Sequence, residues 1–131
     1  MTDSLTAQQA ESYLLSKPEA SLYYPFGDDV KVFKVKNKMF ATIALGAESV
    51  FKGASKNYWI NLKSDPEESI MLRDIFPAII PGYHMNKRLW NTVMLDGTIP
   101  KGEIERMIDN SYLLVVSKMT KKDQQSIFIH L

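Results

Sequence analysis

The 131-residue sequence contains no cysteine. That absence excludes a disulfide framework, thiolate zinc ligands and a thiol nucleophile. No apolar run approaches the roughly 20 residues needed to cross a bilayer, and the first residues lack the cationic and apolar regions of a signal peptide. We therefore expect a protein without membrane association that resides in the cytoplasm.

Common catalytic motifs are also missing. The six glycines are scattered and form no G-x-x-x-x-G-K-[ST], G-x-G-x-x-G or G-x-S-x-G pattern. The two histidines, His84 and His130, lack the H-x-x-x-H spacing of many zinc sites. Glu67 and Glu68 suit the start of a helix better than a general acid/base pair. We therefore expect no catalytic residues, no metal site, no cofactor and no enzymatic activity.

The composition is that of an ordinary globular protein, with 45% apolar and 24% charged residues. The length suits one domain, residues 1–131, with one core. A net charge of +1 hides an asymmetry, because residues 1–29 carry one cation and five anions whereas residues 30–131 carry fifteen cations and ten anions. The pI near 7.9 lies below the value of about 9 that marks strongly basic nucleic-acid binders, so attraction to phosphate would depend on local clusters.

Periodicity and turn residues predict an α+β protein with elements in the order α-β-β-β-β-α-β-α. The first element is a helix over about 7–16 with a Thr6–Gln9 capping box, and a strand begins at about 21. Hairpin arms at 30–35 and 39–45 are joined by a turn at 36–38, and a further strand lies at 57–62. A helix begins at Pro66 and is ended by Pro77, a strand follows at 92–95, and Ile104 to Met119 mark a long last helix.

Two local patterns add detail to this prediction. The alternation of Met39, Ala41, Ile43 and Leu45 indicates one buried face on the second hairpin arm. The tail at residues 120–131 is ambiguous, because Ser126–Ile129 suits either an added strand or a docking segment.

The segment from Pro81 to Asn91 combines a histidine, two cations, two carboxamides and two aromatic rings. If residues 84–91 form a helical turn, His84, Lys87, Arg88 and Asn91 share one face. Such a face can hold a phosphate on Lys87 and Arg88, with Asn86 or Asn91 bonding a sugar or base edge and Trp90 stacking. In the alternative, Trp90 and Tyr83 pack internally, His84 and the asparagines cap backbone groups, and the cations are solvated.

A second group of cations lies on the predicted hairpin. Strand alternation places Lys34 and Lys36 on one side near the turn, with Lys31 and Lys38 close by. A basic hairpin tip of this kind can approach the phosphates of a duplex. Lysines on exposed strands also prevent edge-to-edge pairing, which is the alternative explanation.

These motifs resemble the signature of the MmcQ/YjbR family. The resemblance is carried by His84-Met85-Asn86-Lys87, Trp90, Leu95-Asp96-Gly97 and Ser64-Asp65-Pro66-Glu67, and it extends from Lys17-Pro18-Glu19-Ala20 to the last helix. It implies a CyaY-like fold with a single antiparallel sheet packed by helices, in a family of uncharacterised function described as DNA-binding. Iron binding, which the frataxin-like fold also suggests, relies on a carboxylate-rich first helix, and this helix offers only Glu11.

Three functional hypotheses follow. The first is a DNA-binding or polyanion-binding module that uses Lys34, Lys36, Lys38, His84, Asn86, Lys87, Arg88, Trp90 and Asn91. The second is a protein-interaction or small-ligand module with an aromatic pocket around Tyr58, Tyr83 and Trp90. The third is an unrecognised enzyme that uses His84. We expect a monomer, and the sequence identifies no protein partner.

Overall fold

The computed structural model describes residues 4–46 and 57–129. Within them, six strands form one antiparallel sheet in the order β1-β2-β3-β4-β6-β5, which confirms the predicted α+β class. The strands are β1 (Ala20–Tyr23), β2 (Lys31–Val35), β3 (Lys38–Leu45), β4 (Tyr58–Lys63), β5 (Ile79–Pro81) and β6 (Trp90–Met94). The helices are α1 (Ala7–Leu15), α2 (Pro66–Ile75), α3 (Lys101–Val116) and α4 (Lys121–Phe128).

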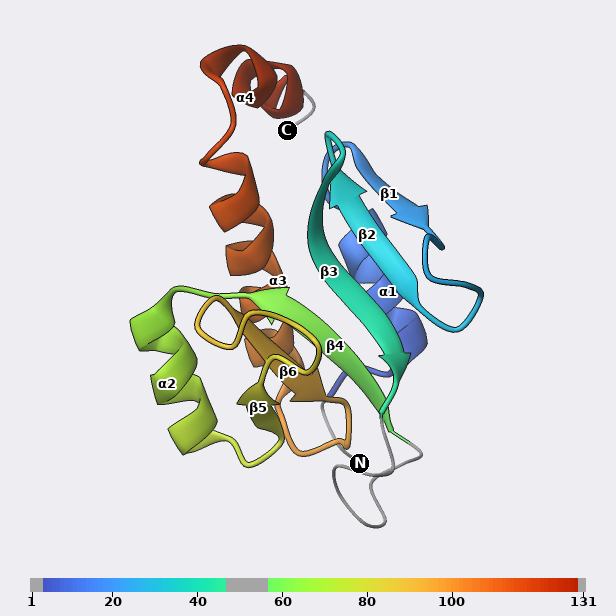
Figure 1. The fold of residues 1–131 in the computed structure, drawn as a ribbon, viewed down its shortest axis with the longest axis vertical. Helices are drawn as coiled ribbons and strands as arrows, with labels where there is room; N and C mark the ends of the chain where they lie inside the picture. Colours follow the sequence, from blue (N-terminus) through green and yellow to red (C-terminus); the bar gives the residue numbers. More distant parts are fainter. Residues whose placement is uncertain (1–3, 47–56, 130–131) are drawn as a thin grey trace.

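The two faces of the sheet have different neighbours. Figure 1 shows α1 and α3 behind the sheet and the loop between β5 and β6 in front of it. We call the helix-covered side the inner face and the opposite side the outer face. In the part of the chain that the structure describes, no helix is long and apolar enough to cross a bilayer.

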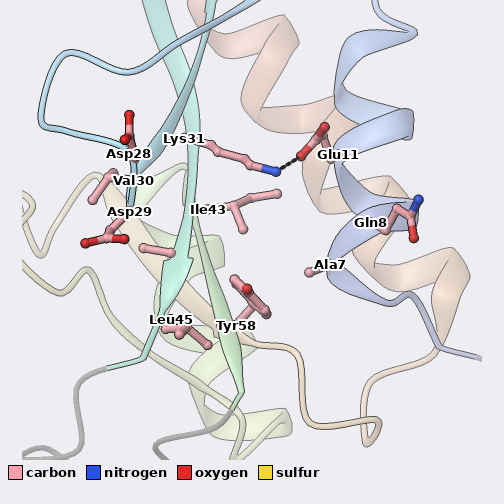
Figure 2. Close-up of a pocket in the computed structure, with 11 residues that line it drawn as sticks. Ala7, Gln8, Glu11, Asp28, Asp29, Val30, Lys31, Ile43, Leu45 and Tyr58 are labelled. Atoms are coloured by element: carbon pink, nitrogen blue, oxygen red, sulfur yellow. Dashed lines mark hydrogen bonds and ion pairs between the residues drawn. The ribbon is translucent and has the colours of Figure 1, made fainter.

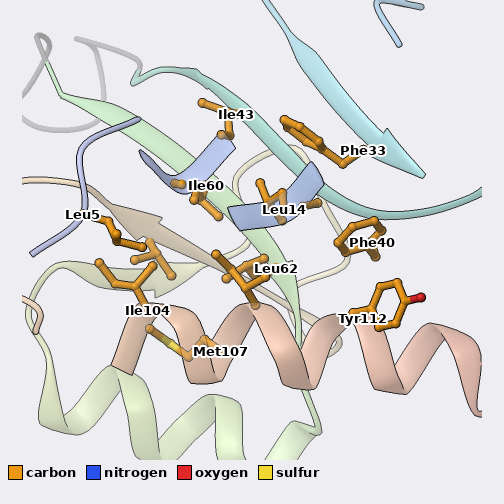
Figure 3. Packing of buried hydrophobic residues seen from close by; sticks show 14 of the residues in the cluster. Leu5, Leu14, Phe33, Phe40, Ile43, Ile60, Leu62, Ile104, Met107 and Tyr112 are labelled. Carbon is orange, nitrogen blue, oxygen red and sulfur yellow. The ribbon is translucent and has the colours of Figure 1, made fainter. Parts of the chain in front are cut away.

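The core lies between the inner face and the helices α1 and α3 (Figure 3). Its large side chains with almost no exposed surface include Leu14, Phe33, Phe40, Ile60, Leu62, Ile104 and Ile108. The rings of Phe40 and Tyr112 meet edge to face, with centroids 5.3 Å apart, and so connect β3 with α3. Each such side chain stabilises the fold by about 1.5–3 kcal/mol through burial.

Local sequence signals start the helices α1 and α2 as predicted. The Thr6 hydroxyl accepts a hydrogen bond from the N–H of Gln9, and the Gln9 side chain accepts one from the N–H of Thr6, which forms the capping box of α1. Asp65 caps α2, whose first residue is Pro66. The N–H of Phe76 makes the last hydrogen bond of α2, immediately before Pro77.

The hairpin of β2 and β3 turns through Lys36 and Asn37, at the predicted position. Both residues have positive φ, 45° and 63°, as a two-residue type I′ turn requires. Val35 and Lys38 face each other across this turn.

A bulge near the turn breaks the predicted alternation of β3. Phe33 faces Ala41 and Lys34 faces Met39, so Phe40 is the extra residue. Phe40 and Ala41 are both fully buried in the core, whereas Met39 lines a pocket on the outer face. The predicted buried face is therefore confirmed for Ala41 and Ile43, which are in the core, and is wrong for Met39 and for Leu45, which is exposed.

Two elements of the structure are absent from the predicted order. The strand β5 spans only three residues, too few for a periodic pattern. The tail forms the helix α4, capped by a hydrogen bond from the N–H of Asp123 to the Thr120 hydroxyl, so the strand alternative is wrong. The docking alternative is confirmed, because Ile127 is buried in the core cluster.

Candidate functional site

The predicted helical turn over residues 84–91 is wrong. Residues 82–89 form a loop of turns between β5 and β6, and β6 begins at Trp90. His84 has a φ of 60°, in the left-handed region that a right-handed helix does not contain. The four side chains predicted to share one helical face, those of His84, Lys87, Arg88 and Asn91, therefore do not share it.

Internal hydrogen bonds hold this loop together. The Asn86 side-chain oxygen accepts from the N–H groups of Arg88 (2.9 Å) and Leu89 (3.1 Å). The Lys87 ammonium donates to the carbonyl of Gly82 at 2.7 Å. Asn86 and Lys87 thus bond backbone groups of their own loop, as the structural alternative expected of the asparagines.

Trp90 and Asn91 belong to the interior. Trp90 is only 8% exposed and Asn91 only 2%. The Asn91 amide donates to the carbonyl of Ser69 and accepts from the Arg73 guanidinium at 3.1 Å, which connects β6 with α2. Neither side chain is available to stack on or bond to a base.

The structure does not bring Lys34 and Lys36 to one side, contrary to the prediction. The Lys36 ammonium forms an ion pair with Glu19 at 3.1 Å and a hydrogen bond with the Ser126 hydroxyl of α4. It is therefore neutralised next to α4, whose Ile127 packs in the core. The left-handed backbone at Lys36 ends the strand alternation on which the prediction depended.

Lys34 lies on the outer face, because it is paired with Met39 and its ammonium stands 5.2 Å from the centre of the Tyr23 ring. Lys38 is exposed and faces Val35, whose side chain points to the core. In the described residues, neither Lys34 nor Lys38 forms an ion pair. Of the three hairpin lysines predicted to bind nucleic acid, Lys34, Lys36 and Lys38, only Lys34 shares a face with His84.

A pocket of about 490 Å³ lies on the outer face. We call it the outer-face pocket. Its walls come from β3, β4, the loop before β2 and the loop after β5. The lining residues are Phe26, Val30, Met39, Thr42, Ala44, Leu45, Trp59, Asn61, Tyr83, His84 and Met85. They are mainly apolar or aromatic, which is typical of sites for small molecules.

Three rings form one wall of this pocket. The Trp59 and Tyr83 rings are perpendicular, at 88°, with centroids 5.6 Å apart. The His84 ring packs against Tyr83 with a centroid separation of 4.1 Å. These ring contacts fix the orientation of the three side chains before any ligand arrives.

A polar network fastens the loop to the outer face. The Tyr83 N–H donates to the Thr92 hydroxyl at 2.8 Å, and that hydroxyl donates to the Asn61 side-chain oxygen. The Asn61 amide donates to the Thr42 hydroxyl at 3.1 Å. The three polar side chains lie on adjacent strands, β3, β4 and β6. Because each is paired, the network places Tyr83 rigidly beside the pocket.

The indole N–H of Trp59 is a hydrogen-bond donor without an acceptor in this region of the described structure. The residue is only 5% exposed, and its indole N–H has no hydrogen-bond partner among the described residues. A buried donor without an acceptor is uncommon in proteins.

A larger cleft of about 810 Å³ lies between α1 and the ends of β2, β3 and β4 (Figure 2). Figure 2 shows Lys31 reaching across the cleft to Glu11, with Asp28 and Asp29 on the opposite rim. The hydrogen bond to Glu11 raises the pKa of Lys31 above its usual 10.5. Among the described residues that line this cleft, Lys31 is the one cation and is already paired, and there is no aromatic pair like that of Trp59 and Tyr83.

The predicted aromatic pocket of Tyr58, Tyr83 and Trp90 is not formed. Tyr58 lines the cleft beside α1, and Trp90 is buried in β6. Trp59, which the prediction left out, lines the pocket with Tyr83. The signal for it was present, because Trp59 and Asn61 share one face of a strand and Tyr58 and Ile60 the other.

Among the described residues, no group of three or more His, Cys, Asp or Glu side chains could hold a metal ion. His130 lies outside those residues.

Comparison with known proteins identifies the family of this chain. The model of the YjbR family matches residues 15–114, which span both the hairpin and the loop of the outer-face pocket. The chain belongs to the YjbR family.

Its relatives include uncharacterised proteins from several bacteria. The chain is 36% identical to the uncharacterised protein YbdF of Escherichia coli O157:H7 over 120 residues, which cover 92% of each chain. It is 26% identical to the uncharacterised protein YjbR of Escherichia coli K12, covering 92% of this chain and 96% of that protein. The crystal structure of the Deinococcus radiodurans protein DR2400, with a DUF419 domain, matches with a TM-score of 0.81 and 34% identity over 96% of this chain and 90% of that one.

Proposed function

We propose that this chain is a non-enzymatic binding module and that the outer-face pocket holds a flat, apolar ring of a small organic ligand. The observation that carries the proposal is the perpendicular pair of Trp59 and Tyr83 on the wall of a pocket of about 490 Å³. This volume lies within the range of about 300–1,000 Å³ that ligand pockets occupy.

The chemistry of the lining limits the ligand. Among the described residues that line the pocket, none carries a carboxylate or an ammonium group. A neutral or weakly charged ring therefore loses little free energy on entering, whereas a bare ion would remain uncompensated. Two polar lining residues, Thr42 and Asn61, already bond each other, so shape and apolar contact contribute most of the affinity.

The test uses nuclear magnetic resonance with indole and naphthalene as probes. The protein has two tryptophans, so the Trp59 indole N–H signal can be assigned by comparison with Trp90→Phe. We expect both probes to shift the Trp59 signal and leave the Trp90 signal in place. Tyr83→Ala should weaken binding, because it removes one aromatic wall.

Tyr58→Ala is the matched control. It also removes a tyrosine ring, but from the residue next to Trp59 in the sequence. Tyr58 lines the cleft on the other side of the sheet, so its loss should leave probe binding unchanged. Equal loss in the two variants, or no shift of the Trp59 signal at any probe concentration, would contradict the proposal.

A second candidate function is single-stranded nucleic-acid binding on the same face. It is favoured by Lys34, which has no ion pair among the described residues and lies on the outer face together with His84. Exposed aromatic rings beside cations suit stacking of bases and contact with phosphates. Four other predicted residues do not support it. The ammonium groups of Lys36 and Lys87 bond to groups of the protein itself, and Trp90 and Asn91 are buried.

Labelled single-stranded and duplex DNA, titrated at low and high salt, test this candidate. We expect Lys34→Glu to weaken binding and to flatten its salt dependence. Lys101→Glu, which makes the same charge change at the exposed start of α3, is the control. If the wild type fails to bind either DNA even at low salt, the nucleic-acid candidate should be abandoned.

A further inference from the structure

A second apolar surface lies on α2, at the margin of the molecule in Figure 1. A groove of about 440 Å³ runs between α2 and the first turns of α3. We call it the α2 groove. Its apolar lining comes from Met71, Leu72, Ile75 and Phe76. It shares no lining residue with the outer-face pocket.

Two of these side chains are exposed to an unusual degree. Met71 and Ile75 lie one helical turn apart, and each is 60% exposed. The solvent-facing side of a surface helix normally carries polar residues. Neighbouring large apolar side chains that stay exposed on a helix are typical of a surface that another molecule covers.

The rim of the groove carries an excess of negative charge. Asp65, Glu67, Glu68 and Glu103 line it, with Arg106 as the one cation among its lining residues. The Arg106 guanidinium donates to Glu68 at 2.7 Å and to Glu103 at 2.8 Å, so those two acids already neutralise it. Asp65 and Glu67 remain exposed on the rim without an ion pair among the described residues.

We propose that the α2 groove binds an amphipathic helix of another protein, whose apolar side chains contact Met71 and Ile75 and whose lysine or arginine side chains pair with the acidic rim. An apolar floor with charged margins is the arrangement that recognises helices in grooves. The ten residues of α2 extend about 15 Å, which suits a contact of roughly three helical turns.

A second copy of this chain is a poorer occupant. In a two-fold dimer the same surface meets itself. The acidic rim would then face another acidic rim, and like charges at an interface weaken association. A partner of positive charge avoids this repulsion. Its attraction to the acidic rim also raises the rate of association.

The test uses a labelled peptide of about twelve residues, close to the length of α2, with leucines on one face and lysines on the other. A twin peptide has glutamate in place of each lysine. We expect the wild-type protein to bind the lysine peptide, with affinity that falls as salt rises, and to bind the glutamate twin at least about tenfold more weakly.

Substitutions locate the contact. Ile75→Ser should weaken binding by about tenfold, and Glu67→Lys should weaken it further at low salt. Both side chains are exposed, so both variants should fold, which circular dichroism verifies. Leu113→Ser removes an exposed leucine of α3 outside the groove, and Glu105→Lys reverses a charge outside it; both should bind like the wild type.

Several outcomes would overturn the proposal. They are failure of the wild type to bind the lysine peptide at low salt, equal binding of both peptides, and equal loss in Ile75→Ser and Leu113→Ser. Sedimentation that shows a dimer lost on Ile75→Ser would also overturn it, in favour of a second copy as the occupant. The result does not depend on the outer-face pocket, because none of these residues lines that pocket.

Discussion

The backbone of Gly46 lies directly against the Trp59 indole. A Cβ atom at position 46 would come within 2.2 Å of both Cε2 and Nε1 of the indole ring, closer than van der Waals contact permits. Glycine at this position therefore allows Trp59 to take its place in the wall of the outer-face pocket.

We expect Gly46→Ala to displace the Trp59 ring and to lower the free energy of unfolding by about 1–3 kcal/mol. Urea denaturation measures the loss, and tryptophan fluorescence reports the displacement. Gly102→Ala is the control, because a Cβ atom there meets nothing within 4 Å. Its position in the first turn of α3 leads us to expect a gain of about 0.5–1 kcal/mol. Similar behaviour of the two variants would contradict the close contact.

Thr92→Val should destabilise the loop that carries Tyr83. The substitution leaves the N–H of Tyr83 and the oxygen of Asn61 without their partner, which costs about 1–3 kcal/mol for buried groups. Thr42→Val removes only one acceptor of the Asn61 amide, and we expect a smaller loss. Urea denaturation of both variants measures the order, and a larger loss in Thr42→Val would contradict the network.

The stability of the protein should fall at high pH because of Tyr112. Burial and the neighbouring negative charge of Glu19 raise the pKa of Tyr112 to about 12, and its hydroxyl donates to the carbonyl of Pro18 at 2.6 Å. In the unfolded chain this tyrosine releases its proton near pH 10. Between about pH 10 and pH 12 the folded state retains a proton that the unfolded state has lost, so the free energy of unfolding falls as pH rises.

We expect Tyr112 to account for a loss of roughly 3 kcal/mol across that interval. Urea denaturation at several pH values, from about 9 to about 12, measures it. Tyr112→Phe should lack this component of the pH dependence, whereas Tyr24→Phe, at a residue 46% exposed, should retain it. A wild-type profile that Tyr112→Phe leaves unchanged would contradict the assignment.

Lys36 should stabilise the packing of α4 against the rest of the protein. Lys36→Met removes the ion pair with Glu19 and the hydrogen bond to Ser126. Because the pair is partly exposed, we expect a change below about 1 kcal/mol in global stability. Faster amide hydrogen exchange in α4 is the more sensitive measurement. Lys38→Met, at an exposed residue without an ion pair among the described residues, should exchange like the wild type.

Local features of the fold were predictable from the sequence. The capping box of Thr6 and Gln9, the start of α2 at Pro66 and the turn at Asn37 all depend on interactions within a few residues. Such interactions are present in the sequence pattern itself. The resemblance to the YjbR family was visible for the same reason, because its motif is a contiguous run of residue types.

The direction in which the candidate side chains point was not predictable from the sequence. Lys36 was expected beside Lys34 and instead pairs with Glu19. For Trp90 the sequence left two roles open, stacking on a base and internal packing, and the structure shows a buried side chain on β6. In both cases the partner is distant in sequence or belongs to another element, and periodicity contains no information about it.

The order of residue types alone decided the α+β class, the starts of α1 and α2, the position of the hairpin turn and the family. The assembled sheet decided which aromatic residues meet, since Tyr83 reaches Trp59 only when β6 lies beside β4 and the loop after β5 folds over the outer face. The physical reason is range: caps and turns arise from bonds between near neighbours in the chain, whereas a pocket arises from packing among strands that only the completed fold brings together.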